Sequence, residues 1–543
     1  MKNKLCKHYP LIISVCVLVF LVAVCLIFSV KKNQGHLIYA LDDAYIHMAI
    51  AKNFVQHGVW GATKYDFNSS SSPILWLLLL SLDYFFFGVN VAAPFLLNII
   101  CAILVCVVSY VFLKKQKVHP LLVCIVLQGV IFFTPLPAMI FSGMEHTMHL
   151  LITIVFFSLA VEVLSKKDPD VIKSRLLFIS APLLTATRYE SIFLVFVVCC
   201  LCVIKRRLWY ALRLGCIGIL PFILYGVISV SKGWYFVPTA FFLKCNWVTY
   251  FFSKGQSITF LHFFYDRIVS TPHILFFVVS ILLMYIIRLN RFSGRMMIGE
   301  EKQLMAGIFL AITFLHMQFA GIGWYYRYEA YLVGLGILII GVMLGEYFPG
   351  KFFSGKRKEV LLKCCVLGVF FFVFAKPLIF RGKTSLLQIS TATHNIYEQQ
   401  YQMGLFLNKF YQGESIAAND VGIINYLTDI RTLDLYGLIS IEVIDAKLHR
   451  KYNTAMIRAL VAQRKVKIVI VGDHWSIPRG GIPQEWVKVG QWKIPNNIAC
   501  GNDTVSFYAV DLLEKDNLIK RLKLFSSSLP KDVQQAGLYT VVE

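Results

Sequence analysis

The sequence has few charged residues for its length. Only 15% of its 543 residues are Asp, Glu, Lys or Arg, whereas 57% are hydrophobic and the mean hydropathy is +0.66. A water-soluble chain of this size could not bury so much apolar surface. This composition therefore excludes an ordinary soluble enzyme and predicts a multi-pass membrane protein.

The sequence also lacks a small-residue cleavage site after its first apolar run, and it lacks a Cys/His spacing typical of zinc sites. Residues 11–30 are therefore expected to remain as an uncleaved first span, because the run is too long for the core of a signal peptide. The fourteen cysteines lie mostly inside apolar runs, where cysteine acts as a small buried hydrophobe. No disulfide framework is expected.

Apolar runs predict the membrane-spanning helices. Residues 73–88 hold Asp83 within about fifteen residues, which predicts an interfacial or re-entrant helix rather than a crossing. With that segment left out, the sequence predicts eleven spans, at residues 11–30, 91–113, 118–135, 147–164, 176–187, 191–204, 211–230, 273–288, 304–320, 329–347 and 359–378.

Carboxylates are scarcer than basic residues, with 30 Asp and Glu against 53 Lys and Arg, and the net charge is +23. The basic residues gather in short loops between spans, as the positive-inside rule expects, so a nucleic-acid partner is not predicted. Eleven spans place these loops and the N-terminus in the cytoplasm, and place the chain end outside. The protein is predicted to lie in the plasma (inner) membrane.

The chain changes character after residue 380. Residues 397–411 have a helical pattern, and three short strand-like runs follow at 466–472, 485–492 and 504–512. The sequence therefore predicts two domains: a mainly α transmembrane catalytic domain at 1–380 and a small extracytoplasmic α/β domain at 381–543.

Unusual polar residues all fall on the predicted outer side of the membrane. The first outer loop, residues 31–90, carries the pair Asp42 and Asp43, and later outer segments add further acids, bases and aromatics: Tyr45, Glu145, His146, Arg188, Glu190, Trp234, Lys244, Trp324, Arg327 and Tyr328. Ionisable groups near the membrane are costly and commonly functional. Each also has a plainer explanation, such as a solvated loop for the aspartates, a structural ion pair for Arg188 and Glu190, or interfacial anchoring for Lys244 and Arg327.

Carboxylates beside cations at a lipid–water boundary suit transfer of a group from a lipid-anchored phosphate. A carboxylate can take the proton of an acceptor hydroxyl as general base. Lys, Arg or a divalent cation (Mg²⁺, Mn²⁺ or Ca²⁺) held by Asp42 and Asp43 can neutralise the departing phosphate. Aromatic side chains can stack on sugar rings, and grooves between helices can hold a polyprenyl tail.

Several motifs resemble those of the bacterial GT-C membrane glycosyltransferases, most closely the group containing the mycobacterial terminal arabinofuranosyltransferases. The opening motif resembles Asp-Asp-(Ala/Gly)-(Tyr/Phe)-Ile followed by Ser-Ser-Pro-Leu-Trp, here residues 42–46 and 71–76. The later similarities occur in the family's order, at 142–145, 187–190, 233–244, 324–328 and 420–437. Tyr189 departs from the family's Pro, and 237–239 lacks its Asn.

The resemblance implies a hexosyl- or pentosyltransferase that moves a sugar from a polyprenyl-phosphate donor to an envelope polysaccharide or glycolipid, by an inverting single displacement. Asp42 and Asp43 are then expected to act as base and as metal or acceptor ligand, in either order, with Glu145 in support. The donor-phosphate candidates are Arg188, Lys244 and Arg327. The remaining substrate-binding candidates are Tyr45, His146, Glu190, Trp234, Trp324 and Tyr328.

Two rival functions stay open at this stage. A flippase or other transporter for lipid-linked sugars would need polar residues at mid-membrane on several helices. A metal-dependent phosphoethanolamine transferase would need a His/Asp ligand group in the outer domain, where His394 and His474 stand isolated in the sequence.

Overall fold

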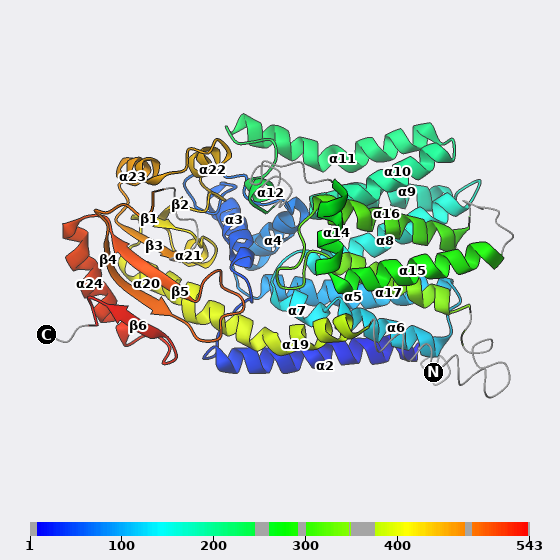
Figure 1. Cartoon of the computed structure of the whole chain (residues 1–543), viewed down its shortest axis with the longest axis horizontal. Coiled ribbons are helices and arrows are strands. Elements are labelled where there is room, and N and C mark those ends of the chain that lie inside the picture. The colour runs from blue at the N-terminus through cyan, green and yellow to red at the C-terminus, as the bar shows by residue number, and fades with distance from the viewer. Residues whose placement is uncertain are drawn as a thin grey trace.

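The computed structural model describes residues 8–244, 260–291, 300–346, 348, 375–472 and 480–540. Within them the chain forms a bundle of long helices at one end and a sheet-containing unit at the other, with two short helices between (Figure 1). The fold is thus mainly helical with a small C-terminal sheet region, as predicted. The predicted span at 359–378 lies largely outside the described residues.

The helices of the bundle follow the apolar runs of the sequence. Five are long and apolar enough to cross a membrane: α2 (Tyr9–Lys32), the α6–α7 stretch (Pro120–Phe141), α5 (Ala93–Lys115), α8 (His146–Ser165) and α11 (Leu208–Ser231). Helix α14 (Phe260–Ser270) and helix α15 (Pro272–Arg291) form a sharply bent pair that would count as a sixth. The remaining helices of the bundle are α9 (Val171–Thr187), α10 (Ile192–Ile204), α16 (Glu301–Phe319), α17 (Ala330–Leu344) and α19 (Lys376–Ile396). By length and apolar composition the described residues therefore support fewer spans than the eleven predicted.

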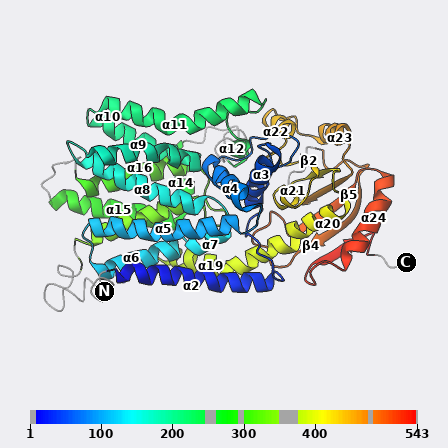
Figure 2. The ribbon, with the colours of Figure 1, turned by 180° about the vertical axis from the view of Figure 1, so that it is seen from behind.

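Helices α3 (Asp43–His57) and α4 (Ile74–Phe87) lie between the bundle and the sheet (Figure 2). Helix α3 ends at Gly58, whose φ of +67° turns the chain into the following loop. Helix α4 begins after Pro73 and has only 14 residues, too few to cross a bilayer at 1.5 Å per residue. This short helix coincides with the segment predicted to be interfacial.

The sheet has six strands in the order β2-β1-β3-β5-β4-β6. The strands are β1 (Ser415–Ala418), β2 (Arg431–Asp434), β3 (Ile468–Gly472), β4 (Val487–Lys493), β5 (Thr504–Ala509) and β6 (Gln534–Gly537). The β1, β2 and β3 strands pair in parallel, and the other pairings are antiparallel. Strands β3, β4 and β5 confirm the three strand predictions.

Helices pack around the sheet and connect it to the bundle. They are η2 (a π-helical turn, Tyr397–Tyr401), α20 (Gln402–Phe410), α21 (Ile423–Leu427), α22 (Ile441–Leu448), α23 (Thr454–Gln463) and α24 (Leu512–Ser526). Phe406 of α20 and Trp492 of β4 are fully buried and pack ring against ring at 5.9 Å. Helix α19 lies along α2 and continues directly into η2, so one helical stretch joins the bundle to the sheet (Figure 1).

Candidate active site

The two adjacent aspartates point to different partners. Asp43, the first residue of α3, forms an ion pair with Arg327, with Oδ2 2.6 Å from the guanidinium nitrogen. Arg327 is 1% exposed, whereas the Asp43 side chain is 24% exposed. Asp43 is therefore a partly accessible carboxylate held next to a buried cation.

Asp42 binds the sheet-containing unit. Its Oδ2 accepts a hydrogen bond from the Gly422 N–H at 2.7 Å, and its Oδ1 accepts one from the Ile423 N–H at 2.8 Å. These amides stand at the start of α21, where a helix leaves its N–H groups free and favours a negative charge. The contact joins the first predicted outer loop to a segment 380 residues further along the chain.

Gly422 is fitted closely against this carboxylate. A Cβ added at position 422 would lie 2.1 Å from the Asp42 carbonyl oxygen and 2.7 Å from its Oδ1. The φ of Gly422 is −78°, which any L-residue adopts readily. The position therefore excludes a side chain because of the close approach of Asp42 and not because of backbone conformation.

A second charged cluster lies around Arg188. This guanidinium donates to Glu145 at 2.5 Å and to Glu190 at 2.7 Å, and it lies 2.8 Å from Nε2 of His146. Glu145 is 1% exposed and also lies near His47, at 3.8 Å. Four elements meet here: α3 through His47, the start of α8, the end of α9 and the short helix η1 (Tyr189–Ser191).

Tyr328 connects the two clusters. Its ring lies 5.0 Å from the guanidinium carbon of Arg327 and 5.4 Å from that of Arg188. Both distances allow cation–π attraction. The two guanidinium groups and their carboxylate partners therefore form one connected charged region.

Two cavities meet at this region. The inner cavity, of about 270 Å³, is lined by Asp43, Glu145, Arg188 and Arg327 and by a set of aromatic side chains: Tyr189, Phe193, Phe222, Phe241, Phe319 and Tyr328. The outer cavity, of about 260 Å³, faces the sheet-containing unit. It is lined by Leu41, Asp42, Asp43, Trp324, Arg327 and Tyr328 and by residues beyond 395 that include Gln400, Asn419, Asp420, Tyr436 and Cys500. Asp43 and Arg327 thus border both cavities.

Hydrogen bonds fix the loops that surround the cavities. The Thr239 N–H donates to the Ser69 carbonyl at 2.9 Å, and the Thr239 hydroxyl donates to the Leu438 carbonyl at 2.5 Å. Asp434 is fully buried and accepts from the N–H groups of Tyr436, Leu438 and Ile439. Leu438 lines both cavities, and hydrogen bonds hold it to residues of two motifs predicted from the sequence, 233–244 and 420–437.

Burial raises the pKa of Asp42, and the nearby negative charge of Asp420 raises the pKa further, although the amides of Ile423 and Gly422 oppose this shift. Burial likewise raises the pKa of Asp420, with Asp43 and Asp434 adding to the shift. Asp42 and Asp420, which both line the outer cavity, therefore have pKa values above the ordinary range of Asp.

Most of the site residues predicted from the sequence lie in this region. Glu190 also lines the inner cavity and His146 contacts it through Arg188, whereas Trp324 lines the outer cavity. Tyr45 instead packs in the core, where its hydroxyl accepts from the Tyr39 N–H at 3.1 Å. Trp234 lines a different cavity, together with Lys232, Thr432 and Arg464. The side chain of Lys244 lies outside the described residues.

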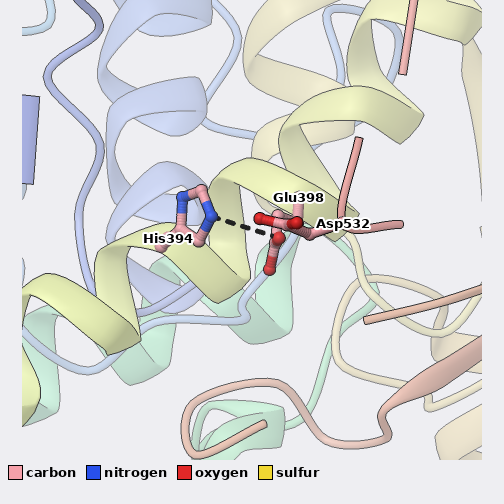
Figure 3. Close-up of side chains that lie close together, drawn as sticks. All are labelled: His394, Glu398 and Asp532. Atoms are coloured by element: carbon pink, nitrogen blue, oxygen red, sulfur yellow. Dashed lines mark ion pairs between the residues drawn. The ribbon is translucent and has the colours of Figure 1, made fainter. Parts of the chain in front are cut away.

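The outer-cavity residues that come from beyond residue 395 were not predicted as site residues. Asp420 belongs to a motif that is visible in the sequence, but Gln400, Asn419 and Cys500 match no motif residue. His394, interpreted as isolated in the sequence, lies close to Glu398 and Asp532, so that interpretation was wrong (Figure 3). His474 is outside the described residues.

A divalent cation between Asp42 and Asp43 stays a prediction. Both oxygens of Asp42 already accept amide hydrogen bonds, and Oδ2 of Asp43 faces Arg327. Amide N–H groups and a guanidinium bring positive charge to the positions that a metal would occupy. This arrangement does not fit a metal ion shared by the two aspartates.

The comparisons with known proteins point to one fold. Residues 394–508 match a family model described as a domain of unknown function (DUF8728). A search of curated protein sequences gave no match. Two solved structures are similar over 91% of this chain and 98% of their own: ArnT from Cupriavidus metallidurans bound to undecaprenyl phosphate (TM-score 0.50, 10% identity) and the same protein in the apo state (TM-score 0.50, 11% identity). The chain therefore has an ArnT-like fold, and five helices of its described residues are long and apolar enough to cross a membrane.

Proposed function

We propose that this chain is a membrane glycosyltransferase that transfers a sugar from a polyprenyl-phosphate donor to a glycan or glycolipid of the cell envelope. The observation that carries the proposal is that Asp43 and Arg327 border both the inner, aromatic-lined cavity and the outer cavity. A carboxylate at the meeting point of two cavities can serve a donor from one side and an acceptor from the other. The likeness to a structure bound to undecaprenyl phosphate supports a lipid-linked donor.

The inner cavity suits the donor. Arg188 and Arg327 are buried cations that can exchange their carboxylate partners for phosphate oxygens, for which the planar guanidinium is well shaped. The aromatic side chains of Phe193, Phe222 and Phe319 offer apolar contacts for the first units of the lipid. The outer cavity then receives the acceptor hydroxyl.

The reaction is a single displacement with Asp43 as general base. The acceptor oxygen attacks the anomeric carbon as the bond from that carbon to the phosphate oxygen breaks. The electron pair of that bond leaves with polyprenyl phosphate, whose charge Arg327 and Arg188 stabilise. The acceptor proton passes to the Asp43 carboxylate, and the anomeric configuration is inverted.

Asp42 has a positioning role in this proposal. Its hydrogen bonds to Gly422 and Ile423 hold the sheet-containing unit against the start of α3. The carboxyl ends of β1 and β2, where Asn419, Asp420 and Tyr436 line the outer cavity, then face the site. We further propose the predicted topology of eleven spans, with a cytoplasmic N-terminus and residues 381–543 outside the plasma membrane.

Complementation of a deletion strain tests the proposal. Wild type, Asp43→Asn and Asp83→Asn are expressed at matched levels, and envelope glycans are compared by composition and linkage. Asp83 lies in α4 of the same predicted loop but lines neither cavity, so it is a matched carboxylate control. We expect the deletion to lose one sugar, which identifies the donor, and Asp83→Asn but not Asp43→Asn to restore it. Full restoration by Asp43→Asn would refute the assignment of the base.

A further inference from the structure

Three side chains that commonly bind metals meet at the junction of the helical bundle and the sheet. His394 at the end of α19 and Glu398 in η2 lie one helical turn apart, and Asp532 lies in the turn between α24 and β6. One potential ligand atom from each residue falls within 4.8 Å of the other two (Figure 3). None of the three lines the inner or outer cavity, so this cluster is separate from the candidate active site.

Glu398 is a buried carboxylate that lacks hydrogen-bond donors. Its side chain is 1% exposed, and neither carboxylate oxygen accepts a hydrogen bond from the described residues. Its Oε1 lies 3.1 Å from Nε2 of His394, as an ion pair if the imidazole is protonated. A buried carboxylate is strongly unfavourable unless a positive charge compensates it. Figure 3 shows that this carboxylate is directed toward Asp532 and His394.

The other nitrogen of His394 has a partner of its own. Nδ1 lies 3.1 Å from Oδ1 of Asn33, the residue that ends α2. An amide oxygen accepts, so Nδ1 carries a proton, and in the neutral imidazole Nε2 is then an acceptor facing a carboxylate oxygen. Two acceptors at 3.1 Å require a proton or a cation between them. This is also the arrangement in which metal-binding histidines are usually oriented, with the second ring N–H donated to an oxygen.

We propose that His394, Glu398 and Asp532 bind a divalent transition-metal ion of the zinc type. An imidazole nitrogen with two carboxylates is a donor set that zinc accepts, whereas Mg²⁺ and Ca²⁺ prefer oxygen ligands alone. Asp532 is exposed, which leaves an entry path and room for a water ligand. The ion ties the turn before β6, the edge strand of the sheet, to the helical stretch that leaves the bundle.

The site is structural in this proposal. Three elements converge on it: α2 through Asn33, the α19–η2 stretch through two ligands, and the turn after α24 through the third. An ion that binds the folded chain and not the unfolded one stabilises the folded state by mass action. Metal binding should therefore raise the unfolding temperature, independently of sugar transfer.

The test uses the full-length chain without a histidine tag in lipid nanodiscs. The protein is stripped with chelator and titrated with Zn²⁺ against a fluorescent competitor, and bound metal and the unfolding midpoint are measured. Wild type should bind one more Zn²⁺ per chain than His394→Gln or Asp532→Asn, and only wild type should gain a clear rise in midpoint. Asp516→Asn removes an exposed carboxylate from α24 and is the matched control, expected to behave as wild type.

Two further variants separate a metal site from a simple ion pair. Glu398→Gln keeps the shape of the side chain but removes the charge, so it should lose the metal while remaining folded. Asn33→Ala should weaken Zn²⁺ affinity about 10–100-fold, the usual effect of removing a group that orients a ligand. Equal Zn²⁺ binding by wild type, His394→Gln and Asp532→Asn, or no binding by wild type, would overturn the proposal and leave only the His394–Glu398 ion pair.

Discussion

Gly422→Ala should disable the site although it removes no charged group. The added methyl would lie 2.1 Å from the Asp42 carbonyl oxygen, and an ordinary contact begins at about 3.4 Å, so the two segments must separate by roughly 1.3 Å. The carbonyl belongs to the backbone just before α3, so Asp43 moves with it. A misplacement of about 1 Å in a reacting group can cost about 100-fold in rate. Overpacking of this kind also costs about 1–3 kcal/mol of stability.

The assay measures sugar transfer in membranes at matched protein levels, together with the unfolding midpoint in nanodiscs. Gly307→Ala is the matched control, because a Cβ at this position in α16 meets no atom within 4 Å. We expect Gly422→Ala to lose about 100-fold in transfer and to unfold at lower temperature. Gly307→Ala should keep wild-type transfer and unfold at the same or a higher temperature, because alanine favours a helix more than glycine does. Transfer by Gly422→Ala within a factor of about three of wild type would refute the coupling between α21 and the base.

Two other predictions follow from the charged groups. Arg327→Lys keeps the charge but loses the planar guanidinium that pairs with Asp43 and lies over the Tyr328 ring. The rate of sugar transfer, measured at several donor concentrations, should fall at least about tenfold. Unchanged kinetics would contradict the role assigned to Arg327. Because burial raises the pKa of Asp42 above its unfolded value, the folded chain holds a proton that the unfolded chain releases, so the contribution of Asp42 to stability should be greatest below about pH 4 and be lost as pH rises through about 7. Asp420→Asn removes the charge that helps to raise this pKa and should flatten the fall in unfolding midpoints between pH 4 and 7; an unchanged slope would exclude Asp420 as a cause.

The fold was largely predictable because hydrophobic runs and alternating patterns are local signals. The short helix at 74–87, which we predict to be interfacial, followed from a run too short to cross and interrupted by Asp83. Strand β3 is an apolar run, and β4 and β5 mix apolar residues with polar ones in strand-like patterns, so all three were found, whereas β1 and β2 have four residues each and were missed. The span count was harder, because helices such as α10 and α17 are apolar yet shorter than a full crossing.

The site was predictable in part, for a physical reason. Residue type and the predicted side of the membrane singled out Asp43, Glu145, Arg188 and Arg327, which the structure brings to one charged region, since ionisable groups near a membrane are rare. Their pairing was not predictable, because it depends on contacts between residues 43 or more positions apart. Aromatic residues carried the weakest signal: Tyr45, Trp234 and Trp324 have the same chemistry but lie in a core, a separate cavity and the outer cavity.

The proposed metal site could be predicted from the sequence only in part, for the same reason. His394 and Glu398 are four residues apart, a spacing that places both on one face of a helix and that is visible in the sequence. The third residue, Asp532, is one exposed aspartate in a chain with 30 acidic residues. Only the path of the chain from α24 to the edge strand β6 brings it to the other two.

The two adjacent aspartates lie at the start of helix α3. Asp42 occupies the N-cap position of α3 and Asp43 its first turn, yet the Asp42 side chain does not cap its own helix and instead accepts from the amides of α21. The two carboxylates therefore separate, one toward the sheet and one toward Arg327. Because Asp42 and Asp43 are neighbours in the chain, a displacement of the sheet-containing unit should also displace Asp43, the proposed base. In the proposed mechanism, the contact of Asp42 with the sheet-containing unit therefore sets the alignment of Asp43, so both aspartates are expected to matter although only Asp43 takes the proton.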